Sequence, residues 1–197
     1  MIKAKFGKDL DAQIHRFFPF LFRRNLNPNL LSACGVVVSL LAALAFAIGA
    51  FVIGGLLVMV GGFFDLVDGA VARHNGTNSH WGAFLDSTLD RLVDMGLLLG
   101  ILMFYAGAGE LGLAWLTGIA LVATVMVSYT KARAESIVPD FNGGILERAE
   151  RVLILVAGAL FGLMPLAIGL LALGSTVTAL QRMNLAYRRM TELDTTH

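Results

Sequence analysis

The sequence predicts an all-α integral membrane protein in which six transmembrane helices follow an N-terminal interfacial amphipathic helix. Composition is the first reason: 57% of the residues are hydrophobic and only 15% are charged, whereas soluble domains carry roughly 25% charged residues. The mean hydropathy of +0.75 agrees with this reading. The second reason is the recurrence of long apolar runs, and the third is the sorting of basic residues between them. We expect a single domain over residues 1–197.

The N-terminal segment, residues 1–28, is expected to lie on the membrane surface. Its stretch KDLDAQIHRFFPFLFRRN mixes charged and aromatic residues, which is typical of an interfacial helix. The helical bundle then occupies residues 29–190. A spanning helix needs about 20 apolar residues, and the fifth run is shorter, so we expect residues 145–151 to extend it. The six apolar runs are 30–50, 51–72, 84–106, 111–129, 152–163 and 164–180.

Basic residues mark one side of the predicted bundle. All 15 lysines and arginines lie before the first run, near the loop between the second and third runs, between the fourth and fifth runs, or after the sixth. The connections on the other side carry one charge, Glu110. Because cytoplasmic loops are enriched in Lys and Arg, we expect a multi-pass protein of the cell membrane. Both termini and the loop at 74–81 would then be cytoplasmic.

Four aspartates lie at the cytoplasmic ends of the second and third runs, in the stretch FFDLVDGAVARHNGTNSHWGAFLDSTLD. Asp65 and Asp68 are three residues apart, and Asp86 and Asp90 are four apart, so each pair lies on one helix face. The two helices are joined by a short loop, so all four carboxylates can converge. Such a group would repel itself strongly without a cation. Oxygen ligands without His or Cys favour Mg²⁺, Mn²⁺ or Ca²⁺ over zinc.

Two other interpretations of these aspartates were weighed. The carboxylates could be solvated helix-end charges or partners of Arg73 and Arg91, but four at this spacing point to a functional site. From a different functional class, the protein could be a divalent-cation transporter. A transport path needs sites along its length, whereas the first, fourth, fifth and sixth runs contain no carboxylate.

The residues around the aspartates form a longer signature. It reads D-x-x-D-G-x-x-A-R-x8-G-x-x-x-D-x-x-x-D, and the chain fits it without a departure over residues 65–90. This pattern resembles the signature of the CDP-alcohol phosphotransferase family. The resemblance implies a six-helix membrane fold, usually a homodimer. It also implies a reaction in which an alcohol attacks the β-phosphate of a CDP-linked lipid and CMP leaves.

The resemblance also implies roles for single residues. Mg²⁺ or Mn²⁺, as two ions, would be held by Asp65, Asp68, Asp86 and Asp90. Asp90 would in addition serve as the general base. Residues that would contact the CDP moiety are Gly69, Arg73 and Ser79, together with Asn29 and Ser32 from the stretch NLNPNLLSACG. In that stretch, helix capping by Asn27 with Pro28 at the first helical position is the alternative.

The acceptor is suggested by three basic stretches near the cytoplasmic ends of the last three runs. The stretches KARAE, GGILERAER and QR are similar to prokaryotic phosphatidylinositol-phosphate synthases. In that subfamily the acceptor is inositol 1-phosphate, and Lys131, Arg151 and Arg182 match the residues that hold its phosphate. Spacing alone places Arg148 and Arg151 on one helix face. Positive-inside charge and contact with lipid headgroups are the alternative reading of these basic residues.

The sequence therefore predicts transfer of a phosphatidyl group from CDP-diacylglycerol to inositol 1-phosphate, in contact with membrane lipid and with no nucleic-acid partner. Two alternatives stay within the same chemistry. Glycerol 3-phosphate as acceptor would make the protein a phosphatidylglycerophosphate synthase, and an isoprenoid ether donor would make it an archaetidylinositol phosphate synthase. Asp94 continues the face of Asp86 and Asp90, either as support for the metal ligands or as a neighbour of Arg91.

Overall fold

The computed structural model describes residues 28–76, 79–139 and 141–195. Within these residues the regular structure is helical throughout. The interfacial helix expected over residues 1–28 lies outside the described residues, apart from Pro28. The helices are α3 (Pro28–Ala47), α4 (Phe51–His74), α5 (His80–Gly107), α6 (Leu111–Glu135), α7 (Arg148–Leu160) and α8 (Met164–Thr195).

Each apolar run predicted from the sequence corresponds to one of these helices, but several ends differ. α6 and α8 run past the predicted ends to Glu135 and Thr195. The residues from 181 to 195 contain neither Gly nor Pro, so nothing in them interrupts a helix. The predicted extension of the fifth helix back to residue 145 is wrong, because α7 begins at Arg148. Leu146 donates its backbone N–H to Thr178 Oγ1 at 3.1 Å, and Glu147 is extended.

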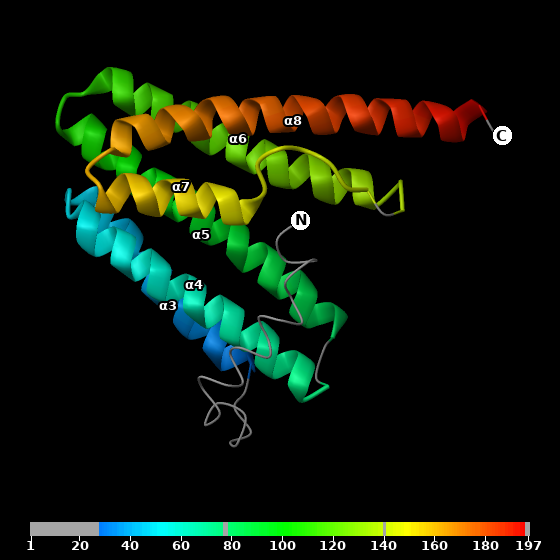
Figure 1. Cartoon of the computed structure of the whole chain (residues 1–197), viewed down its shortest axis with the longest axis horizontal. Coiled ribbons are helices and arrows are strands. Elements are labelled where there is room, and N and C mark those ends of the chain that lie inside the picture. The colour runs from blue at the N-terminus through cyan, green and yellow to red at the C-terminus, as the bar shows by residue number, and fades with distance from the viewer. Residues whose placement is uncertain (1–27, 77–78, 140, 196–197) are drawn as a thin grey trace.

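The helices pair as three antiparallel hairpins, α3 with α4, α5 with α6, and α7 with α8 (Figure 1). α3 also packs on α5, and α6 packs on α8. The three tight turns of the hairpins lie together at one end, at the left of the figure. One of them contains Gly49 at a φ of 79°, a left-handed conformation that glycine adopts without strain. The end of α4, the start of α5, the end of α6 and the start of α7 lie away from these turns.

The core is formed where the hairpins meet. Phe46, Ile101 and Ile168 are fully buried there. Gly100 lets α5 approach α3 closely, because a Cβ at this position would lie 2.2 Å from the Ala43 carbonyl oxygen. Small residues at such crossings are common in membrane bundles.

The outer surface of the bundle is apolar. Many large aliphatic side chains point outward, and Leu173, for example, is 67% exposed. Four helices of the described part, α3, α4, α6 and α8, are long and apolar enough to cross a membrane. Contiguous apolar surface of this extent is rare in soluble monomers. The protein is therefore an all-helical membrane protein.

Candidate active site

Three carboxylates meet where α4 ends and α5 begins. Asp65 and Asp68 come from α4 and Asp86 from α5, and each offers an oxygen that lies within 4.8 Å of the others. Asp68 is buried, while Asp65 and Asp86 are partly exposed. Ser32 of α3 donates a hydrogen bond from its hydroxyl to Asp68 Oδ2. We call Asp65, Asp68 and Asp86 the carboxylate triad.

The donor set of the carboxylate triad fits a hard divalent cation. Three carboxylates this close repel one another, and burial of Asp68 removes the water that would otherwise screen its charge. Bound Mg²⁺ or Mn²⁺ would relieve both costs, and carboxylate oxygens are the ligands these ions prefer. Residues from two helices contribute, so the arrangement depends on the α4–α5 hairpin and not on local sequence alone.

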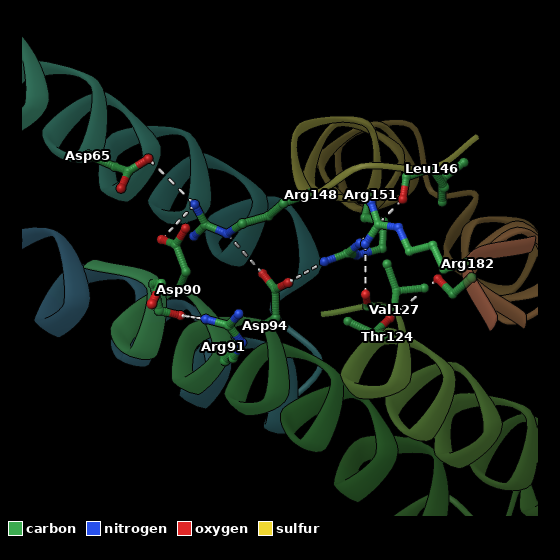
Figure 2. Close-up of polar contacts among 12 residues, drawn as sticks. Asp65, Asp90, Arg91, Asp94, Thr124, Val127, Leu146, Arg148, Arg151 and Arg182 are labelled. Atoms are coloured by element: carbon green, nitrogen blue, oxygen red, sulfur yellow. Dashed lines mark hydrogen bonds and ion pairs between the residues drawn. The ribbon is translucent and has the colours of Figure 1, made fainter. Parts of the chain in front are cut away.

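The fourth predicted ligand, Asp90, lies beside the carboxylate triad and pairs with a guanidinium. Arg148 is the first residue of α7. Its Nη1 is 2.7 Å from Asp90 Oδ1. The same nitrogen is 3.4 Å from Asp65 Oδ2 (Figure 2). Helical spacing places Arg148 on one face with Arg151, but Arg148 was not among the residues predicted for the site. No sequence signal identifies its acidic partners, because they come from helices far away in the chain.

Asp94 joins this group to Arg151. Asp94 is 8% exposed and accepts from Arg151 Nη2 at 2.9 Å. Its other oxygen lies 3.4 Å from Arg148 Nε. Arg91 was the other neighbour expected from the sequence. Its Nη1 donates a hydrogen bond to the backbone carbonyl of Ser87. The structure therefore places Asp94 between the two arginines of α7, as Figure 2 shows.

The three residues predicted to hold the acceptor's phosphate come from three helices and have different environments. Lys131 forms an exposed ion pair with Glu135 at 3.7 Å. Arg151 is buried, and its Nε has no hydrogen-bond partner. Arg182 is also buried and donates to the Gly143 and Val127 carbonyls at 2.8 and 2.7 Å.

The residues predicted to contact CDP lie around the carboxylate triad and beyond it. Ser32 touches the triad directly, as described. Arg73 extends over Gly69, where a Cβ would lie 3.2 Å from Arg73 Nη1. Ser79 caps α5 by accepting from the Gly82 backbone N–H at 3.0 Å. Asn29 is exposed in the first turn of α3. Their contacts with a donor remain predictions.

Comparison with known proteins points to the same chemistry. The family model for CDP-alcohol phosphatidyltransferase matches residues 25–181. A phosphatidylinositol phosphate synthase from Streptomyces avermitilis is 40% identical over 193 residues, covering 90% of this chain and 79% of the relative. An archaetidylinositol phosphate synthase from Methanothermobacter thermautotrophicus is 40% identical over 185 residues, covering 90% and 92%.

Solved structures agree in fold. Phosphatidylinositol phosphate synthase (PgsA1) of Mycobacterium tuberculosis with CDP-DAG bound is 30% identical, with a TM-score of 0.77 over 91% of this chain and 92% of that chain. The same enzyme in complex with manganese and citrate gives a TM-score of 0.78 at 30% identity, over 91% and 88%. The family match spans most of the chain and contains the carboxylate triad. The chain belongs to the CDP-alcohol phosphatidyltransferase family.

Proposed function

We propose that the protein transfers the phosphatidyl group of CDP-diacylglycerol to inositol 1-phosphate, releasing CMP and forming phosphatidylinositol phosphate. The observation that carries this proposal is the continuous path from the carboxylate triad through Arg148 and Asp94 to Arg151. One end suits the diphosphate of the donor and the other suits the phosphate of the acceptor. The two relatives described above support the acceptor, since inositol phosphate is common to both of their names.

The reaction exchanges one phosphorus–oxygen bond for another. The acceptor hydroxyl oxygen bonds to the β-phosphorus of the donor, and the bond from that phosphorus to the CMP oxygen breaks. The hydroxyl proton passes to Asp90, which lies one turn after Asp86 on α5. A carboxylate is a weak base, so proton transfer accompanies bond formation. Mg²⁺ or Mn²⁺, as two ions on Asp65, Asp68, Asp86 and Asp90, would neutralise the diphosphate and the departing CMP.

Recognition of the two substrates is assigned to two groups of residues. The nucleotide of the donor would contact Asn29, Ser32, Gly69, Arg73 and Ser79. The phosphate of the acceptor would lie near Lys131, Arg151 and Arg182, because a desolvated phosphate dianion needs charge-assisted donors. Arg151 has a buried N–H available for such a contact. Arg182 already bonds two carbonyls, so its contribution is mainly its charge.

The proposed membrane arrangement uses all six helices of the bundle as spans. α5 and α7 then cross together with α3, α4, α6 and α8, and the N-terminal segment lies at the interface as part of the same single domain. Sorting of Lys and Arg supports cytoplasmic termini and a cytoplasmic active site in the cell membrane. A homodimer follows from the family resemblance.

The acceptor is tested by comparing three compounds side by side. The purified enzyme is given CDP-diacylglycerol, Mg²⁺ and either inositol 1-phosphate, free inositol or glycerol 3-phosphate, and CMP release is measured. We expect turnover with inositol 1-phosphate and none with free inositol. Turnover with glycerol 3-phosphate but not inositol 1-phosphate would instead indicate a phosphatidylglycerophosphate synthase.

A second donor has support from one comparison. The Methanothermobacter relative named for an archaetidyl product is as similar as the Streptomyces relative, at 40% identity. The same assay with a CDP-linked isoprenoid ether lipid distinguishes the two donors. We expect CDP-diacylglycerol to be used at the higher kcat/KM.

A further inference from the structure

Arg148 is held by carboxylates from two other helices. Its Nη1 lies 2.7 Å from Asp90 Oδ1 and 3.4 Å from Asp65 Oδ2, and its Nε lies 3.4 Å from Asp94 Oδ1 (Figure 2). The side chain is 29% exposed. One guanidinium charge therefore neutralises part of three negative charges in a half-buried setting, where electrostatic interactions are stronger than in water.

Two of these carboxylates are among the residues proposed to bind the divalent cation. Asp65 is a member of the carboxylate triad, and Asp90 follows Asp86 by one turn on α5. Any divalent ion that binds Asp65 or Asp90 therefore shares its ligand with a guanidinium. Two positive charges on one carboxylate repel each other, so the presence of Arg148 must weaken the binding of the ion.

Two other arginines nearby have different partners. Arg151 pairs with Asp94 and with the Leu146 carbonyl. Arg91 donates to a carbonyl of its own helix. The ion pairs of Arg148 reach both the carboxylate triad and Asp90.

We propose that Arg148 is a positioning residue that acts as a built-in counter-cation and limits the affinity of the site for divalent metal. It competes with the ion for Asp65 and Asp90. The anionic phosphates of donor and acceptor offer the guanidinium other partners. Binding of these phosphates would then release the carboxylates and let the metal bind more tightly, so that metal and substrate assemble together. The inference rests on the metal-dependent activity proposed above.

A purely structural role predicts the opposite sign. Arg148 also joins α7 to α4 and α5 through these ion pairs. If this clamp were its only role, neutralising the residue would loosen the carboxylates, and metal affinity would fall. Measuring the direction of the change in metal affinity therefore separates the two roles without reference to turnover.

The experiment is a Mn²⁺ titration of the full-length protein in detergent, with free Mn²⁺ followed by electron paramagnetic resonance. We expect Arg148→Gln to lower the Kd for Mn²⁺ at least tenfold. Arg148→Lys keeps the charge and should stay within threefold of the wild type. Arg133→Gln is the matched control, because it removes the same charge from an exposed residue that bonds Ser136. Its Kd should also stay within threefold.

An unchanged or higher Kd in Arg148→Gln, with Arg133→Gln normal, would overturn the inference. Elution of each variant from gel filtration at the wild-type volume establishes that it is folded. If Arg148→Gln fails this check, Arg148→Met is titrated in its place, and we expect the same decrease in the Kd for Mn²⁺. A wild type that binds no Mn²⁺ would instead refute the metal-dependent function, so the two failures are distinguishable.

Discussion

Replacing Arg182 with alanine should destabilise the fold as well as weaken acceptor binding. Arg182 lies in α8 and is 4% exposed. It donates from Nε to the Gly143 carbonyl at 2.8 Å and from Nη1 to the Val127 carbonyl at 2.7 Å. These bonds connect α8 to α6 and to the connection that precedes α7. Truncation removes both bonds and leaves their carbonyls without this donor.

The size of the effect follows from the two bonds. A hydrogen bond that involves a charged group contributes about 1.5–3 kcal/mol, so losing both should cost about 3–6 kcal/mol. For a chain of this size each kcal/mol lowers Tm by about 2–4 °C, which gives a decrease of about 6–24 °C. Arg182→Lys supplies one ammonium group and should recover about half of the lost stability.

Thermal unfolding in detergent, followed by the loss of the folded peak in gel filtration, measures this change. Arg188→Ala is the matched control because it removes an exposed arginine from the same helix. We expect Arg188→Ala to unfold within about 2 °C of the wild type. The reasoning is refuted if Arg182→Ala unfolds at the same temperature as Arg188→Ala and only its KM for the acceptor rises. In that case the guanidinium serves the acceptor and its carbonyl contacts contribute little to stability.

Three further predictions concern the metal, the base and the topology. Asparagine at any one position of the carboxylate triad should lower CMP release at least a hundredfold, since the ion loses a hard ligand, and full activity in excess EDTA would contradict the metal assignment. Asp90→Asn should lower single-turnover rates far more than it lowers equilibrium binding of CDP-diacylglycerol; the reverse pattern would make Asp90 a ligand only. The topology is tested in a Cys34→Ser background. A cysteine at Gly162 should react with a membrane-impermeant thiol reagent added outside sealed cells, and one at Gly143 should react only after lysis. External labelling at Gly143 would overturn the proposed six-span topology.

The parts of the fold that the sequence could predict depend on local patterns. Apolar runs located the helices, because burial in lipid acts on each helix separately. The carboxylate triad could also be anticipated, since the spacing of Asp65 and Asp68 and the short loop before α5 fix which faces meet. The structure brings Asp86 to the same place.

The parts that could not be predicted depend on contacts between distant helices. The pairing of Arg148 with Asp90 joins α7 to α5, and the contacts of Arg182 with two carbonyls join α8 to α6 and a connecting segment. Spacing along one helix contains no information about such partners. The start of α7 at Arg148 could not be predicted either, because the Leu146 N–H donates a hydrogen bond to a hydroxyl of α8.

In the proposed six-span arrangement, the shortness of α7 sets the depth at which the chemistry takes place. Its 13 residues give a length of about 20 Å, whereas the hydrocarbon core of a bilayer is about 30 Å thick. With the last residue of α7 at the outer edge of that core, its first residue, Arg148, lies roughly 10 Å below the cytoplasmic edge. A water-soluble sugar phosphate must descend into the protein to react, whereas the lipid donor can enter sideways with its tails still among other lipids. The new phospholipid is then made in the leaflet that supplied its precursor, and no tail has to cross the bilayer during turnover.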